Sequence, residues 1–125
     1  MDGIHLLGEW FECADTPAFT DAATLRAVCL EATARAGLTA VGERFHQFEP
    51  QGVTGTVLLA ESHLAIHTWP EDNFATVDVF VCNYLHDNTV KANRLLEFLR
   101  EALQPQRVHE QSIRRGIAPA VRKAA

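Results

Sequence analysis

Cysteine is scarce in this sequence, and the few cysteines form no pattern. The chain of 125 residues contains Cys13, Cys29 and Cys82, and it has no Cys-x-x-Cys pair. An odd number of widely spaced cysteines argues against a disulfide framework and against a cysteine-based zinc site. Unpaired thiols are typical of proteins in a reducing compartment, so we expect a cytoplasmic protein.

Positive charge and long apolar runs are also lacking. Lysine and arginine number 11 against 16 acidic residues, which gives a formal net charge of −5. Proteins that bind nucleic acids usually present a basic face, so we expect no nucleic-acid partner. No apolar run approaches the roughly 20 residues that span a bilayer, and the N-terminus has no basic signal-peptide region, so we expect no membrane partner. A basic cluster near the C-terminus predicts either a solvated tail or a contact for an acidic partner; it comprises Arg114, Arg115, Arg122 and Lys123.

Apolar periodicity predicts six strands and two helices. The first helix is capped by Thr20 or Asp21 and ends at Gly37, and the second is capped by Asp87 or Asn88. The buried face of the second helix is predicted to consist of Ala92, Leu95, Leu96, Leu99 and Leu103. The strands are predicted over residues 4–13, 39–48, 53–60, 63–69, 75–82 and 106–113.

The order β-α-β-β-β-β-α-β predicts an α+β fold, a two-layer sandwich over the single domain 1–125. Two helices cannot cover both faces of so wide a sheet, so we expect both on one face of a mostly antiparallel sheet. The other face then needs a cover, and a second subunit would supply it. Thr16-Pro17 and residues 49–52 are predicted to be turns.

The most unusual segment is AESHLAIHTWPE, residues 60–71, which places polar groups within an apolar run. Because side chains alternate along a strand, His63 and His67 lie on one face, and Leu64 and Ile66 lie on the other. Two imidazoles on one face are candidates for acid–base chemistry, although only one of them need take part. The structural alternative is a pair of histidines that hydrogen bond to water on an open sheet face.

Three other residues are chemical candidates, each with a plain alternative. Cys82 ends a predicted strand and is either a proton donor or nucleophile, or a small buried apolar residue. Thr54 lies between the glycines of GVTG, a context that is also typical of an ordinary turn. Glu71 follows the Trp-Pro corner and could equally be an exposed carboxylate.

These segments resemble one family. The run FHQFEPQGVTGTVLLAESHLAIHTWPE and the later VDVFVCN are similar to the prokaryotic S-adenosylmethionine decarboxylase proenzymes. The resemblance extends from HLLGEWFEC to RVHEQSIRRG and so covers nearly the whole chain. It departs from the usual family pattern at EDNFATVD and at the residues on either side of Cys82.

The resemblance implies that the chain cuts itself between Glu61 and Ser62. Residues 1–61 become one chain, and residues 62–125 become a second chain that starts with a pyruvoyl group made from Ser62. His67 matches the base that takes the Cα proton of residue 62 during processing, and Thr54 matches a hydroxyl that assists. The implied cofactor is therefore self-generated, with neither pyridoxal phosphate nor a metal.

The resemblance also implies the reaction of the mature enzyme. The pyruvoyl group forms a Schiff base with S-adenosyl-L-methionine, CO₂ is lost, and Cys82 donates a proton. The product supplies aminopropyl groups for spermidine and polyamine synthesis. Glu71 matches a ribose-binding carboxylate, Phe48 an aromatic residue near the adenine, and His63 is expected to line the site. Family members are dimers with sites between subunits.

Three alternatives remain open at this point. A pyruvoyl-dependent decarboxylase of ornithine or arginine would keep Ser62, His67 and Cys82, because it needs the same electron sink. An inactive partner subunit would keep the sheet and lose the chemistry. A thiol hydrolase based on Cys82 and His67 would leave the Glu61-Ser62 pair unexplained.

Overall fold

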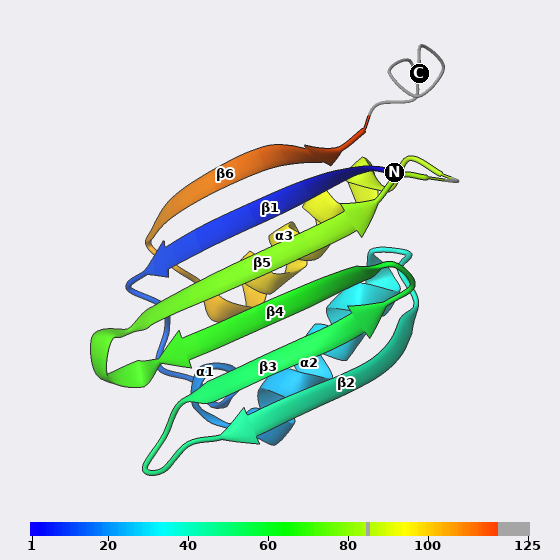
Figure 1. Cartoon of the computed structure of the whole chain (residues 1–125). Helices are drawn as coiled ribbons and strands as arrows, with labels where there is room; N and C mark the ends of the chain where they lie inside the picture. The colour runs from blue at the N-terminus through cyan, green and yellow to red at the C-terminus, as the bar shows by residue number, and fades with distance from the viewer. Residues whose placement is uncertain (85, 118–125) are drawn as a thin grey trace.

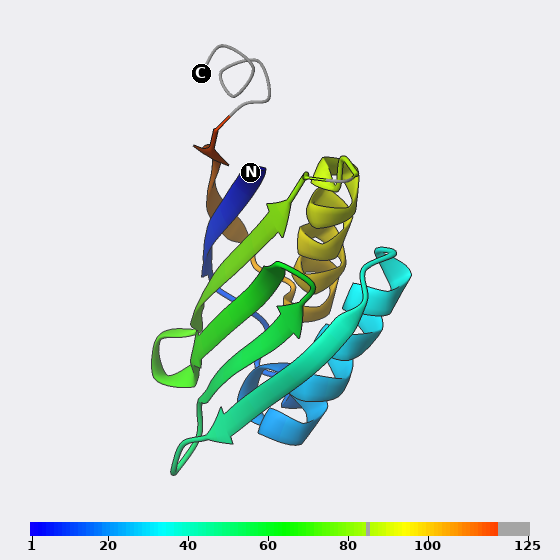
Figure 2. The same cartoon turned by 45° about the vertical axis from the view of Figure 1, so that its right-hand side comes forward.

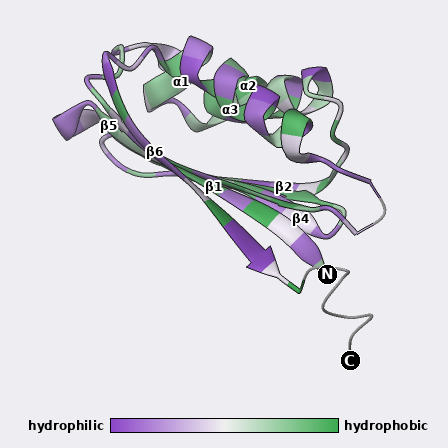
Figure 3. Ribbon diagram, turned by 90° about the horizontal axis from the view of Figure 1, so that it is seen from above, coloured by the Kyte–Doolittle hydropathy of each residue, from purple (hydrophilic) through white to green (hydrophobic). Residues whose placement is uncertain are grey.

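A computed structural model describes residues 1–84 and 86–117, which form a six-stranded sheet with helices on one face (Figure 1, Figure 3). The strand order is β2-β3-β4-β5-β1-β6, and every pairing is antiparallel. The predicted two-layer α+β arrangement is confirmed. The elements are β1 (Asp2–Phe11), α1 (Pro17–Thr20), α2 (Ala22–Arg35), β2 (Ala40–Gln47), β3 (Val53–Leu59), β4 (Ser62–Trp69), the 3₁₀ helix η1 (Pro70–Asp72), β5 (Phe74–Cys82), α3 (Thr89–Leu103) and β6 (Arg107–Gly116).

The two long helices form as their sequences predict. The Asp21 carboxylate caps α2 by accepting a hydrogen bond of 2.9 Å from the Thr24 N–H, which satisfies a donor of the first turn. Gly37 follows the end of α2 with φ of 87°, a left-handed conformation that glycine adopts easily. The predicted buried face of α3 is confirmed. Helix α2 packs against β2 and β3, and α3 packs against β5 and β1 (Figure 2).

A short helix occupies a segment that the sequence predicted to be only a turn. Helix α1 begins at Pro17, which suits the first helical position because that position needs no backbone N–H donor. Phe19 within α1 is fully buried in the core. The turn prediction missed α1 because a single helical turn is too short to show periodicity.

Strand alternation divides the sheet into a helix-covered face and an open face. Leu64 and Ile66 of β4 and Val77 and Val79 of β5 are fully buried beneath the helices. Their neighbours along each strand therefore lie on the open face. This confirms the predicted placement of the β4 histidines on the side of the sheet away from the helices.

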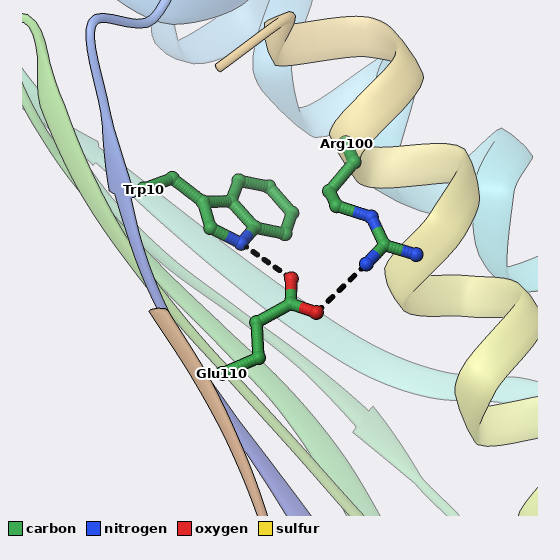
Figure 4. A network of polar contacts seen from close by, with 3 residues as sticks. All are labelled: Trp10, Arg100 and Glu110. Carbon is green, nitrogen blue, oxygen red and sulfur yellow. Dashed lines mark hydrogen bonds and ion pairs between the residues drawn. The ribbon is translucent and has the colours of Figure 1, made fainter. Parts of the chain in front are cut away.

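The edge strand β6 is attached to the helical layer through one polar network (Figure 4). Glu110 accepts a hydrogen bond of 2.8 Å from the Trp10 indole N–H and one of 2.7 Å from Arg100 of α3. Trp10 of β1 is fully buried. Glu110 is half-buried, and the other residues of β6 are exposed. Glu110 thus joins β1, α3 and β6 across the end of the helical layer.

The predicted basic cluster is only partly within the described residues. Arg114 donates to Asp2 at 2.9 Å, and Arg115 lies 3.4 Å from His5 Nδ1, while Arg122 and Lys123 lie outside the described residues. Across residues 1–84 and 86–117, none of the helices has the length and apolar character that a membrane span requires.

Candidate active site

The Glu61–Ser62 bond lies in a tight turn between β3 and β4. Leu59 pairs with Ser62, so Ala60 and Glu61 alone connect the two strands. Glu61 adopts a left-handed conformation with φ of 54°, which is uncommon for a residue with a side chain. The unusual backbone therefore occurs immediately before the serine.

The Ser62 hydroxyl is held beside the end of β5. Its oxygen accepts a hydrogen bond of 3.1 Å from the Cys82 backbone N–H, and Cys82 is only 8% exposed. His63 follows on the open face, with its ring centroid 5.7 Å from that of Phe80 and 6.1 Å from that of His5. The structure therefore brings Ser62 and Cys82 together, with His63 close by on the opposite side of β4.

Thr54 and His67 form a second group of candidates. They are direct cross-strand partners on β3 and β4, and Thr54 Oγ1 lies 2.9 Å from His67 Nδ1. If His67 Nδ1 carries the proton and donates it to Thr54, the Nε2 lone pair is left free to act as a base. The His67 ring also stacks on Trp69, with centroids 5.8 Å apart and planes 23° apart.

A surface hollow of about 340 Å³ unites this second group with the predicted substrate residues. An aromatic ring at Phe48, a second at Trp69 and a carboxylate at Glu71 surround the Thr54–His67 pair. The complete lining is Phe48, Gln51, Gly52, Thr54, His67, Thr68, Trp69 and Glu71. Phe48 and Trp69 are 47% and 37% exposed, so both rings are accessible to a ligand.

The two groups of candidates lie toward opposite ends of β4, a strand that can be followed in Figure 1. Ser62 and His67 are the first and sixth residues of β4, and a strand rises about 3.3 Å per residue, so their backbones are roughly 16 Å apart. Their side chains also extend from opposite faces of β4. One copy of the chain therefore does not bring the His67 imidazole to the Ser62 Cα.

Sequence reasoning did not select Trp69 and His5 as site residues. Trp69 and His67 line both the hollow described above and a neighbouring hollow of about 460 Å³. The only sequence signal for Trp69 was its position two residues after His67, on the same face. His5 gave no signal, because its contacts with Asp78, His63 and Arg115 come from three other strands.

The other two cysteines are poor candidates for chemistry. Burial raises the pKa of Cys13 to about 11 and that of Cys29 to about 12, so both remain protonated near neutral pH. Within the part of the chain that the structure describes, no three His, Cys, Asp or Glu residues converge on a point where they could hold a metal ion.

The fold and these side chains define an α+β protein with two clusters of polar side chains, one near each end of β4. Residues 4–116 match the family model of S-adenosylmethionine decarboxylase. The chain is 45% identical to the S-adenosylmethionine decarboxylase proenzyme of Parasynechococcus marenigrum over 121 residues, which are 97% of this chain and 91% of that protein. The chain belongs to the S-adenosylmethionine decarboxylase family.

Two further comparisons agree with this assignment. The proenzyme of Symbiobacterium thermophilum is 46% identical over 96 residues, which cover 77% of this chain and 70% of that protein. The crystal structure of the adenosylmethionine decarboxylase from Aquifex aeolicus superposes with a TM-score of 0.84 at 36% identity, covering 93% of this chain and 92% of that chain.

Proposed function

We propose that this chain is a proenzyme that cleaves itself between Glu61 and Ser62 and then decarboxylates S-adenosyl-L-methionine. The observation that carries the proposal is the geometry at that bond. A left-handed Glu61 precedes a serine whose hydroxyl is held by the Cys82 N–H. Family membership supplies the reaction class and makes an inactive subunit or a thiol hydrolase the weaker interpretation.

The first step converts an amide to an ester. Ser62 Oγ attacks the Glu61 carbonyl carbon, the C–N bond breaks, and the hydroxyl proton ends on the new amino group of residue 62. Strain in the left-handed turn favours this step because it raises the energy of the starting amide. The Cys82 N–H is well placed to orient the Ser62 oxygen.

The second step cleaves the chain. His67 of a second copy removes the Cα proton of residue 62, a Cα=Cβ double bond forms, and the Cβ–O bond breaks to release Glu61 as a carboxylate. The resulting enamine becomes an imine, water adds, and ammonia leaves, so that residue 62 becomes a pyruvoyl group. Thr54 assists by holding His67 Nδ1.

The residues around position 62 fit the proposed pyruvoyl group. The group is self-generated, and it would supply an electron sink that stabilises the charge left on the substrate when CO₂ departs. Cys82 lies next to residue 62 and would return a proton from Sγ to the substrate Cα. The product is the aminopropyl donor of polyamine synthesis. Three free, buried cysteines support a reducing, cytoplasmic setting.

The hollow favours a nucleoside substrate over ornithine or arginine. The rings of Phe48 and Trp69 offer flat surfaces for a purine, and the Glu71 carboxylate can accept hydrogen bonds from both hydroxyls of a ribose. A small basic amino acid would leave this hollow largely unfilled. The names of the relatives point the same way.

The separation of the two groups supports a dimer. If two copies face each other through their open faces with their β4 strands antiparallel, the end of β4 that carries the Glu61–Ser62 turn in each copy lies near the Thr54–His67 pair of the other. The open face carries exposed apolar side chains that such a partner would cover, including Leu58 at 50% and Ile113 at 44%.

Intact-mass analysis tests the proposal. The purified protein should yield two fragments, 1–61 and 62–125, with the second lighter than its sequence by one ammonia and lacking a free amine. Ser62→Ala is the matched control and should remain whole. Processed protein should release CO₂ from S-adenosyl-L-methionine faster than from ornithine or arginine. A single whole chain under folding conditions would contradict the proposal.

A further inference from the structure

The His67 ring is held by more than its hydrogen bond to Thr54. Trp69, two residues along β4, stacks on it at 5.8 Å, and Phe74 is the direct cross-strand partner of Trp69 on β5. The Trp69 and Phe74 rings are 5.6 Å apart, and Phe74 packs 5.1 Å from Phe11 of β1. The Arg107 guanidinium of β6 lies 4.1 Å above the Phe11 ring.

These contacts form a continuous ladder over four neighbouring strands, which we call the aromatic ladder: Trp69, Phe74 and Phe11, ending at Arg107. Each ring packs against the next, and aromatic pairs at these separations are mutually attractive. The ladder lies on the open face, which has no helical cover. It therefore gives the His67 ring a second supporting contact beside the hydrogen bond to Thr54.

We propose that Trp69, supported by the aromatic ladder, is a positioning residue that sets the plane of the His67 imidazole for proton removal from residue 62. Thr54 fixes the ring at one nitrogen, which still permits rotation about the Nδ1–Oγ1 direction. The Trp69 ring, whose plane lies 23° from that of the imidazole, restricts that rotation. Together, the two contacts hold the direction of Nε2.

The inference rests on the proposed function and concerns one step of the self-cleavage, the elimination. Attack by Ser62 on Glu61 does not use His67, whereas the elimination does. Loss of Trp69 should therefore leave ester formation intact and slow the elimination. Self-cleavage needs no substrate, so any contact of Trp69 with the substrate cannot affect this measurement.

The test follows the maturation of freshly refolded protein by mass spectrometry, with and without hydroxylamine. Hydroxylamine cleaves an ester but not an amide, and it leaves an intact Ser62 at the new N-terminus. Trp69→Ala should release pyruvoyl-bearing fragments about 10- to 100-fold more slowly than the wild type and accumulate hydroxylamine-sensitive ester. Trp69→Phe keeps a flat ring and should restore most of the rate.

A second variant and a control separate positioning from folding. Phe74→Leu removes the second ring of the ladder and should also accumulate ester, to a smaller extent. Val90→Ala truncates an exposed residue of α3, outside the ladder and away from the open face, and should mature at the wild-type rate. Wild-type maturation in Trp69→Ala, or a Trp69→Phe variant as slow as Trp69→Ala, would overturn the inference. Failure of the wild type to cleave would instead contradict the proposed function.

Discussion

Glu61 carries the backbone conformation on which the proposed cleavage depends. A residue with a side chain in the left-handed region costs about 1 kcal/mol. Positive φ alone does not mark the site, because Glu12, Asn73 and Gln104 share it. Glu61 differs from these three because a hydroxyl follows it, and that hydroxyl is held by the Cys82 N–H.

His5, on the open face, should make the stability of the fold depend on pH. Burial lowers the pKa of His5 below its ordinary value of 6.5, with further lowering by Arg115 and His63 and an opposing effect of Asp78. The unfolded chain therefore takes up a proton near pH 6.5 that the folded chain does not. Stability that His5 contributes above this pH should be lost as the pH falls through about 6.5 and then through the lower pKa of the folded state.

Thermal unfolding between about pH 8 and about pH 5 measures this effect. His5→Gln should lose less melting temperature on acidification than the wild type. His86→Gln, a change at an exposed histidine outside the cluster, is the matched control and should follow the wild-type curve. If the melting temperature of His5→Gln falls as much as that of the wild type, His5 is not the source of the pH dependence.

Among the elements, β4 has two roles at once. Its even-numbered residues Leu64 and Ile66 build the core, and its odd-numbered residues His63 and His67 face away from the helices. A shift of one residue in the register of β4 would exchange these faces, so burial of the core residues is what keeps the imidazoles in place.

The edge strand β6 depends on Glu110 for its attachment to the helical layer (Figure 4). Glu110→Ala leaves the buried Trp10 N–H without an acceptor and Arg100 without its carboxylate. An unsatisfied buried donor costs about 1–3 kcal/mol, so the free energy of unfolding should fall by about this amount in urea titrations.

Two further variants test whether the loss of stability comes from the hydrogen bond between Glu110 and Trp10. Glu110→Gln keeps an acceptor for Trp10 and should lose less stability than Glu110→Ala. Ser112→Ala, on the same face of β6 but exposed, should be close to neutral. Equal losses in Glu110→Gln and Glu110→Ala would show that the hydrogen bond to Trp10 contributes little.

At the scale of the whole molecule, the proposed fragments are interleaved. Residues 1–61 contribute β1, β2 and β3, and residues 62–125 contribute β4, β5 and β6. Strand β1 pairs with β5 on one side and β6 on the other, so a strand of the first fragment lies between two strands of the second. Cleavage at Glu61–Ser62 would therefore leave the sheet intact.

Mixed dimers test whether two copies complete one site. His67→Ala and Ser62→Ala chains, each with a different tag, should both remain unprocessed when expressed alone. When they are co-expressed, Ser62 of the His67→Ala chain meets His67 of the other copy. The His67→Ala chain should then be cleaved, as seen in its intact mass.

The matched control is a partner chain that carries both substitutions, which should give no rescue. If the His67→Ala chain stays whole beside the Ser62→Ala chain while the wild type cleaves, the proposed arrangement of two copies is wrong. The wild-type control thus separates the dimer prediction from the proposed cleavage.

The sequence by itself determined the six strands, the two long helices, the caps of α2 and the two faces of β4. These features depend on local periodicity and on single residues such as Asp21 and Gly37, so they can be read along the chain. The resemblance to a family also named Ser62, His67 and Cys82. Helix α1 was not predicted, because one turn carries no period.

Only the tertiary structure decided which of these residues meet. The insertion of β1 between β5 and β6 brings His5 to Asp78, and the β3–β4–β5 registers bring Thr54 to His67 and the Cys82 backbone to the Ser62 hydroxyl. The contact between Trp69 and Phe74 arises in the same way, from the pairing of β4 with β5. Strand order and register are set by pairing between segments that are distant in the sequence, and this pairing depends on the burial of whole faces of the sheet. No local pattern contains that information.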